Sequence, residues 1–229
     1  MTIQEGFKKI EVFKKVNPAS ITNLLPYARL RSFHKGETLF VEKDEGGSLF
    51  FLVDGIAALY KLHSNGDKRT VFIYGAGALL NEMILDYKPV SINAEALRDS
   101  QVLCLNRSRF LSACARDFGL SKAVMDTMTL QIRRLYRLMK NTALNVRGDK
   151  RIVARLWKLS RDFGRLTPRG TEIDFDLTIT QFAELLGAQR ETISRQIQIL
   201  SKQGIIILDK KRFIIPDRDK LLQYFSSPS

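Results

Sequence analysis

Residues 178–202 read TITQFAELLGAQRETISRQIQILSK, and no other stretch of this chain is as informative about its architecture. Thr178 stands three residues before Gln181, which is the spacing of a capping box at the start of a helix. Gly187 then supplies a residue that accepts the left-handed conformation at a helix end. A second helix is predicted from about Gln189 to Lys202. The stretch therefore predicts two helices joined by a tight turn, as in a helix-turn-helix.

The second predicted helix has one apolar and one polar side. Residues Ile193, Ile197 and Leu200 recur at i, i+4 and i+7, so we expect them to face inward. The opposite side carries the side chains that we predict to read bases in the major groove: Arg190, Glu191, Ser194 and Arg195. Arginine can bond guanine O6 and N7 together, and glutamate can accept from cytosine N4. The alternative is an ordinary helical hairpin with a solvated charged face.

A basic hairpin follows this pair of helices. Two apolar strands, Ile205–Leu208 and Phe213–Ile215, flank a basic tip, which predicts a wing. Basic side chains there can bind phosphates and add affinity without sequence information; a solvated basic turn is the alternative. The residues that we predict to contact phosphate are Thr178, Thr180, Gln189, Thr192, Lys202, Lys210, Lys211 and Arg212.

The charge of the chain favours a polyanionic partner. There are 37 Lys and Arg against 24 Asp and Glu, a net charge of +13. The segment from Leu130 to Arg169 contains twelve basic residues and only two acidic ones. It therefore carries a net charge of +10 just before the predicted DNA-reading motif. Such an excess fits nucleic acid or an anionic surface. Its position favours double-stranded DNA.

The N-terminal half reads as short strands from about Arg29 to Asn106. Alternating runs such as Ser48–Val53 and Thr70–Tyr74 are separated by turn clusters at regular intervals. The clusters are Lys35-Gly36-Glu37, Glu45-Gly46-Gly47, Asp54-Gly55, Asn65-Gly66-Asp67 and Gly75-Ala76-Gly77. This spacing predicts an antiparallel roll or barrel. Asn65-Gly66 predicts a type I′ hairpin turn with positive φ at both residues. A helix is expected to begin at Pro18-Ala19-Ser20.

The period of the apolar pattern changes after Asn106. Apolar residues then follow steps of three and four, with one polar lapse at Thr142: Met125, Met128, Ile132, Leu135, Met139 and Val146. This heptad seam predicts a long helix, at about 110–146, that forms a homodimer by coiled-coil packing. A helix packed on its own domain is the alternative. Gly148 lowers helix propensity, and a second helix is predicted over Lys150–Phe163.

In this order, the strand roll, heptad helix, short helix and winged helix-turn-helix resemble the cyclic-AMP-receptor/fumarate-nitrate-regulator (CRP/FNR) superfamily over nearly the whole chain. The segment Phe33-His34-Lys35-Gly36-Glu37-Thr38-Leu39-Phe40, followed by Leu49–Gly55, is similar to the opening of that family's sensor roll. The run Arg190-Glu191-Thr192-Ile193-Ser194-Arg195 closely resembles its recognition helix.

The resemblance implies an α+β fold. A cyclic-nucleotide-binding-like jelly roll with its dimerisation helix would span residues 1–146, and a winged helix-turn-helix domain would span 147–229. Arg190, Glu191 and Arg195, with help from Ser194, would read a TGA-containing half-site in an inverted repeat. Gln196 stands where the family usually has an apolar residue, which implies looser packing of that helix. RNA polymerase is an expected partner if the protein activates transcription.

The sensor departs from the cyclic-nucleotide pattern of the family. Members that bind cyclic nucleotide carry Gly-Glu and, about ten residues on, Arg followed by Ser or Thr for the phosphate. Here the pairs are Asn81-Glu82 and Ile92-Asn93. An apolar Ile92 cannot neutralise a phosphate, so we expect no response to cyclic AMP. We place the effector pocket at Glu82, Asn81, Ile92, Asn93, Arg134 and Leu135.

No cofactor is expected. No cysteine precedes Cys104, whereas iron-sulfur members of the family carry an N-terminal cysteine cluster. Both histidines, His34 and His63, are predicted to lie on the surface, which leaves haem without a ligand. Cys104 and Cys114 are interpreted as small buried or half-buried residues rather than redox switches. Metal-ligand clusters, nucleophile elbows and phosphate-cradling glycine motifs are absent from the sequence, so no enzyme activity is predicted.

The remaining expectations concern location and control. No apolar run approaches the roughly 20 residues of a membrane span, and the N-terminus lacks a signal-peptide core, so we expect a cytoplasmic protein with no membrane partner. The effector, if one exists, is an unknown small molecule. The alternative is a DNA-binding regulator that needs no effector and is controlled by its abundance or by a protein partner.

Overall fold

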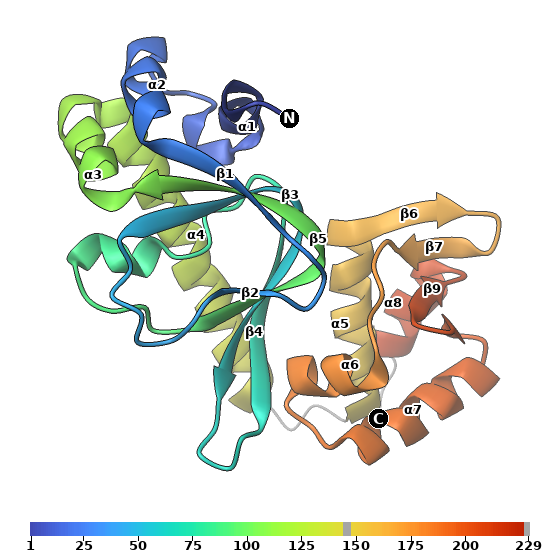
Figure 1. The fold of residues 1–229 in the computed structure, drawn as a ribbon. Helices are drawn as coiled ribbons and strands as arrows, with labels where there is room; N and C mark the ends of the chain where they lie inside the picture. The colour runs from blue at the N-terminus through green and yellow to red at the C-terminus, as the bar shows by residue number, and fades with distance from the viewer. Residues whose placement is uncertain (144–147, 227–229) are drawn as a thin grey trace. The chain divides into compact units, whose positions relative to one another are not determined.

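A computed structural model describes residues 1–143 and 148–226 of the chain, and Figure 1 labels most of its helices and strands. The backbone forms two compact units: Met1–Lys61 with Val71–Lys140, and Leu62–Thr70 with Asn141–Ser229. The predicted boundary at residue 146 lies outside the described residues. Within the part of the chain that the structure describes, no helix is long and apolar enough to span a membrane.

The N-terminal elements build a roll that is preceded and followed by helices. In chain order they are α1 (Ile3–Lys9), η1 (Glu11–Phe13), α2 (Pro18–Leu24), η2 (Leu25–Tyr27), β1 (Ala28–Phe33), β2 (Thr38–Phe40), β3 (Ser48–Leu62), β4 (Lys68–Gly75), η3 (Glu82–Asp86), β5 (Asn93–Asn106), α3 (Arg107–Arg116) and α4 (Phe118–Ala143). The helix expected at Pro18 is α2, whose N-cap is Asn17.

Five strands form the sheet of the roll, in the order β1-β5-β3-β4, with β2 also paired to β5. β5 runs antiparallel to β1, β2 and β3. Its residue Leu103 pairs with Leu30 on one side and with Phe51 on the other. The predicted antiparallel roll is confirmed.

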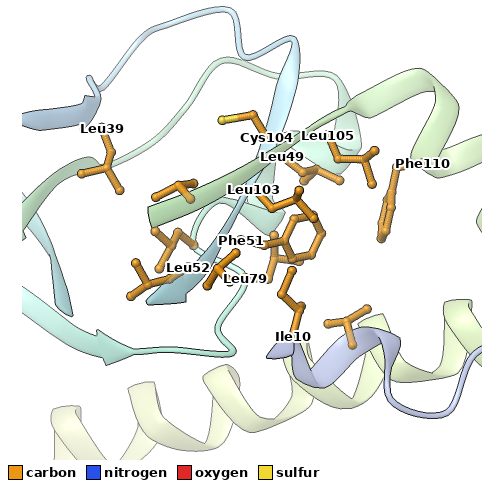
Figure 2. Close-up of a cluster of buried hydrophobic side chains, with 14 of the residues drawn as sticks. Ile10, Leu39, Leu49, Phe51, Leu52, Leu79, Leu103, Cys104, Leu105 and Phe110 are labelled. Atoms are coloured by element: carbon orange, nitrogen blue, oxygen red, sulfur yellow. The ribbon is translucent and has the colours of Figure 1, made fainter. Parts of the chain in front are cut away.

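The core of the roll is apolar and continuous. Figure 2 shows Phe51 of β3 and Leu103 of β5 beside Ile10 and Phe110, which come from the flanking helical segments. All four side chains are fully buried, and the rings of Phe51 and Phe110 lie 5.8 Å apart between centroids. Because helical segments supply part of this core, the sheet and its flanking helices form one packed body.

The Asp54-Gly55 pair is not the strand break that the sequence predicted. It lies inside β3, where the register with β5 shifts on both sides of Asp54. Gly55 has φ +101°, and a Cβ there would lie 2.1 Å from Oγ of Ser100. The backbone N–H of Ile56 donates to that same Oγ at 3.2 Å. A long-range contact therefore turns a local turn signal into a β-bulge within one 15-residue strand.

The Asn65-Gly66 hairpin is present, but its turn is not type I′. Gly66 has φ +85°, whereas Asn65 is not among the described residues with positive φ. The backbone carbonyl of His63 accepts the N–H of Gly66 at 2.9 Å, and the backbone N–H of His63 donates to Asp67 O at 2.9 Å. The Asn65 side chain accepts from the Asp67 N–H at 3.1 Å. A hairpin turn with one left-handed glycine results.

The long helix begins later than predicted, because Asp117 separates α3 from α4. Asp117 is extended, and its Oδ1 accepts the N–H of Leu120 at 3.2 Å. Its Oδ2 accepts the hydroxyl of Ser20 on α2 at 2.7 Å. Asp117 therefore caps α4 and ties it to α2. Val146, the last residue of the predicted seam, lies outside the described residues.

The second unit is a winged helix-turn-helix. Its elements are α5 (Gly148–Phe163), β6 (Gly164–Thr167), β7 (Gly170–Ile173), α6 (Ile179–Leu186), α7 (Arg190–Lys202), β8 (Ile207–Asp209), β9 (Arg212–Ile215) and α8 (Arg218–Ser226). The four strands pair in the order β6-β7-β9-β8. The rings of Phe182 and Phe213, 5.2 Å apart, pack α6 against the wing strand β9. Gly148 begins α5, two residues earlier than expected.

Candidate nucleic-acid interface

The first helix of the motif, α6, begins and ends as its sequence predicts. The N–H of Gln181 donates to Oγ1 of Thr178 at 3.1 Å, and the Gln181 side chain accepts the N–H of Thr178 at 3.0 Å. Gly187 ends the helix in the left-handed conformation, with φ 60° and ψ 53°. The N–H of Ala188 then donates to Ala183 O at 3.1 Å. These bonds satisfy some of the free backbone groups at the two ends of α6 and fix a three-residue turn.

The second helix, α7, presents the predicted polar side to solvent. Ile193, Ile197 and Leu200 are buried. Arg190, Glu191 and Arg195 are exposed, and Ser194 is half-buried. Nη1 of Arg190 lies 3.9 Å from Oε1 of Glu191, a pair that water screens. The first two turns of α7, which follows α6 in Figure 1, therefore carry two exposed guanidinium groups and an exposed carboxylate.

The predicted phosphate-binding residues divide into available and occupied groups. Thr180, Gln189, Thr192 and Lys202 are exposed. The hydroxyl of Thr178 is committed to the capping box of α6, so it is already satisfied within the chain.

The wing shows the same division. Lys210 and Lys211 are exposed at its tip, where Lys210 has φ +56°. Arg212 instead points at acidic residues of its own domain: its Nε lies 3.0 Å from Oδ1 of Asp176, and its Nη1 lies 3.4 Å from Oδ1 of Asp174. The guanidinium also donates to Ile173 O. Arg212 therefore links β9 to the end of β7 and to the residues that follow it. Lys210 and Lys211 remain as the exposed cations of the wing.

Gln196 lies against the start of α5. A Cβ at Gly148 would lie 2.6 Å from Nε2 of Gln196. Oε1 of Gln196 is buried and has no hydrogen-bond partner in the described part of the chain. Among the described residues, the departure from an apolar residue thus leaves a buried acceptor without a hydrogen bond.

Two arginines of α5 were counted in the sequence only as charge. Arg151 and Arg155 donate to backbone carbonyls at the end of α6. Their spacing of four residues places them on one side of α5, which was the only available signal. Residues 30 or more positions away receive these bonds, so the sequence alone could not assign them.

Two of the predicted effector-pocket residues, Asn81 and Asn93, make side-chain hydrogen bonds to backbone groups of the roll. The Asn81 side chain accepts the N–H of Phe50 at 2.8 Å and donates to Ser48 O at 3.0 Å. The Asn93 side chain accepts the N–H of Glu42 at 3.0 Å and donates to Tyr60 O at 3.3 Å. Both amides are buried and engaged, so they link strands and loops of the roll.

A second polar cluster joins the roll to α4. Glu82 and Tyr74 are only 9% and 6% exposed, and Oε2 of Glu82 and the Tyr74 hydroxyl have no hydrogen-bond partner among the described residues. Burial raises the pKa of Glu82, while hydrogen bonds from its own backbone and from Gln131 of α4 oppose that shift. The guanidinium of Arg134 lies 5.6 Å from the centroid of the Tyr74 ring.

The charge states of this cluster follow from its surroundings. Burial, and then the charge of Glu82, raise the pKa of the Tyr74 hydroxyl, which stays protonated at neutral pH. Ile92 is buried and apolar. Ile92 and Asn93, the pair singled out in the sequence, therefore present an apolar side chain and an amide that is engaged within the roll.

The heptad seam is exposed on the single chain. Met139, Met125, Ile132 and Leu135 are 65%, 51%, 49% and 41% exposed, whereas Met128 packs partly on the roll core. Part of α4 thus packs on its own domain, and pairing of two copies through the exposed stripe stays a prediction. Leu135 is exposed on this seam, and its predicted place in the effector pocket stays a prediction.

The predicted exposure of the two histidines and burial of the two cysteines are confirmed. The side chain of His34 is 83% exposed, and His63 is exposed too. Cys104 is buried and Cys114 half-buried. Burial raises the pKa of each thiol to about 11, which keeps the reactive thiolate scarce. Among the described residues, no group of three His, Cys, Asp or Glu side chains lies close enough to hold a metal.

Two family models match the chain: the cyclic nucleotide-binding domain over residues 30–117 and the Crp-like helix-turn-helix domain over residues 150–224. The CRP-like cAMP-activated global transcriptional regulator of Mycobacterium tuberculosis is 25% identical over 222 residues, which cover 96% of this chain and 98% of that protein. The Cyclic AMP receptor protein of Thermus thermophilus is 28% identical over 200 residues, covering 86% and 88%.

A solved structure has the same fold. That of FixK2 from Bradyrhizobium japonicum covers 88% of this chain and 99% of its own, with a TM-score of 0.75 and 22% identity.

Proposed function

Because this chain belongs to the CRP/FNR family of DNA-binding transcription regulators, we propose that it acts in the cytoplasm as a homodimer on an inverted-repeat operator. The observation that carries the proposal is the exposed polar side of α7, with Arg190, Glu191 and Arg195 at its start. These groups suit guanine and cytosine edges in the major groove, and Ser194 can assist them. The family members are regulators rather than enzymes.

The affinity of the proposed complex comes from groups around α7. Thr180, Gln189, Thr192, Lys202, Lys210 and Lys211 are the proposed phosphate contacts. The net charge of +13 supports a strong, salt-dependent attraction to DNA. Arg212 is left out of this set because its guanidinium is bound to Asp174 and Asp176.

The proposed dimer uses the seam on α4. Exposed apolar side chains in a heptad pattern are costly in water and gain stability by pairing with the same stripe of a second copy. A two-fold dimer presents its two reading helices to half-sites about 34 Å apart, one turn of the duplex. This geometry is the reason to propose an inverted repeat.

In vitro selection from random duplexes with the purified protein tests the proposal. We expect an enriched inverted repeat whose half-sites contain TGA and whose binding weakens steeply with salt. Enrichment of no sequence at all, with equal affinity for every duplex, would contradict it.

For the sensor, we propose that cyclic AMP is not the effector and that no cofactor is held. Ile92 cannot pair with a phosphate, and the Asn93 amide is engaged, as described above. A thermal-shift titration tests this: a ligand at 100 times its dissociation constant stabilises the native state by about 2.7 kcal/mol. We expect no shift with cyclic AMP, and a shift that saturates would refute the proposal.

A second candidate is regulation without any effector, through abundance or a protein partner. The contacts of Gln131 with Glu82 and of Arg134 with Tyr74 favour it, because they already join α4 to the roll within one subunit. Equal operator affinity of protein purified under native conditions and of protein refolded from denaturant, which removes any bound small molecule, would support this candidate. Loss of affinity after refolding, restored by cell extract, would support an effector at the Glu82 cluster.

A further inference from the structure

The end of α6 is held from outside the helix-turn-helix. The last carbonyls of an α-helix lack partners within the helix. Leu185 and Leu186 are buried at this end, 1% and 5% exposed, so water has little access to their carbonyls. The next residue, Gly187, already turns the chain toward α7.

Two arginines of α5 satisfy these carbonyls. Nη2 of Arg151 donates to Leu186 O, and Nη2 of Arg155 donates to Leu185 O at 3.4 Å. The cationic donors also oppose the negative end of the α6 dipole. Burial lowers the pKa of Arg155 to about 10, so the group remains charged at neutral pH while its access to solvent is small.

The bonds lie next to the DNA-reading surface. Leu186 is followed by the turn of Gly187, Ala188 and Gln189, and Arg190 begins α7. The N-cap residue Gln189 makes no side-chain hydrogen bond to α7. The start of α7 therefore depends on the turn for its position, and the turn depends on the end of α6.

Building on the proposed function, we propose that Arg151 and Arg155 are positioning residues for sequence reading: they clamp the end of α6 and so hold Arg190, Glu191 and Arg195 in register with the bases. They add discrimination between sequences without touching DNA. The competing role for two arginines in a basic region is direct phosphate contact, which adds affinity for every sequence alike.

The test compares variants of the full-length protein on two duplexes, the selected operator and the same operator with one half-site base pair changed. Arg151→Gln, Arg155→Gln and their double variant remove the clamp, and Arg151→Lys keeps one charged donor. Arg161→Gln is the matched control, because Arg161 is a surface residue of the same helix paired with Asp162, and the same charge is lost. Dissociation constants are measured over a series of salt concentrations.

We expect the ratio of the two dissociation constants to fall about tenfold in each Gln variant, with the slope of log affinity against log salt unchanged. Arg151→Lys should recover part of the ratio, and Arg161→Gln should keep the wild-type ratio. Hydrogen exchange at the amides of Gly187 and Ala188 should quicken in the Gln variants of free protein, which reports on the clamp without DNA. If the double variant does not fold, the single and Lys variants carry the test.

An unchanged ratio in folded Gln variants would overturn the proposal. So would a salt slope reduced by about one for each arginine, since that is the mark of a lost phosphate contact. A wild-type protein with no sequence preference would instead refute the proposed function, while the exchange rates would still decide whether the clamp exists.

Discussion

Arg195 stands one turn into α7, with its side chain exposed and beyond reach of the apolar core. An arginine that bonds guanine through two hydrogen bonds contributes discrimination, because a wrong base leaves its donors unpaired. The neighbouring Ile193 and Ile197 are buried and fix the rotation of the helix. At the scale of one residue, the direction of its side chain therefore decides whether a residue of α7 can contact DNA bases or packs in the domain core.

We predict that Arg195→Ala loses about 1–3 kcal/mol of discrimination at one guanine of the half-site. Operator duplexes with each base pair changed in turn measure the effect by fluorescence anisotropy. The loss should be confined to one position. Equal preference of variant and wild type at every position would rule out a base contact by this residue.

Glu82 gives a prediction about pH. Its pKa is raised by burial, so the folded state holds the proton more tightly than the unfolded chain does. The sign follows: the favourable contribution is complete below the unfolded value of about 4.3 and is lost as the pH rises through the folded value. At neutral pH the ionised carboxylate is therefore a net cost to stability.

We expect Glu82→Gln to raise the melting temperature at pH 7.5 by about 2–4 °C and the gain to shrink as the pH falls toward 4.5. Differential scanning fluorimetry across this range measures it. Glu45→Gln is the control, because Glu45 is exposed. A variant that melts lower than the wild type at pH 7.5 would show that the carboxylate is needed in its charged form.

At the scale of elements, α4 combines two tasks. Its N-terminal end is capped by Asp117 and its residue Met128 reaches the roll core. The other described seam residues, Met125, Ile132, Leu135 and Met139, stay exposed. One helix therefore belongs to the roll by one side and offers another side to a second copy.

Leu135→Asp should convert the protein to monomers, because two like charges would face each other inside an apolar seam. Sedimentation velocity at micromolar concentration measures the state. Leu130→Asp is a matched control: it makes the same change at an exposed leucine five residues back, on nearly the opposite side of the helix. A dimeric Leu135→Asp protein would place the interface elsewhere.

The wing is an element in which one cation is structural and two are free to act. Lys210→Ala should weaken binding to all duplexes alike and reduce the salt slope by about one. Arg212→Ala should instead lower thermal stability, because it removes a guanidinium that pairs with the carboxylates of both Asp174 and Asp176. Titrations in a salt series and melting curves of both variants measure these effects. An unchanged slope for Lys210→Ala would show that the wing does not contact phosphate.

At the scale of the whole molecule, the chain forms two compact units, and residues 130–169, which include the passage from one unit to the other, carry a net charge of +10. Neither unit alone accounts for an inverted-repeat operator. The α4 seam supplies the two-fold axis, and α7 supplies the reading surface. A two-fold symmetric dimer therefore implies a two-fold symmetric operator, and one experiment can test both.

Insertion of five base pairs between the half-sites should lower affinity to that of a single half-site. The insertion rotates one half-site by about half a turn of the duplex relative to the other. The two α7 helices of the dimer can then no longer contact both half-sites at once. An operator with one scrambled half-site gives the reference value. Unchanged affinity for the insertion would contradict binding by a two-fold dimer.

Much of this molecule was predictable from the sequence where the signal is local. The Thr178–Gln181 capping box, the left-handed Gly187 and the buried Ile193, Ile197 and Leu200 all depend on residues within a few positions of one another. The strand roll and the surface histidines followed from patterns of the same range. Such features arise from backbone hydrogen bonds and periodicity, which a sequence displays directly.

Other features depended on partners far along the chain. Gly55 lies in a β-bulge because of its contact with Ser100. The Asn93 side chain is hydrogen-bonded to the backbone of Glu42 and Tyr60. The Arg212 guanidinium is bound to Asp174 and Asp176 of its own domain. A side chain that can bind a ligand can equally bind its own fold, and composition does not distinguish the two. The sequence by itself therefore determined the family, the antiparallel roll, the helix-turn-helix and the outward face of α7. Only the tertiary structure decided which polar groups remain available, because a hydrogen bond made inside the protein is no longer open to a ligand.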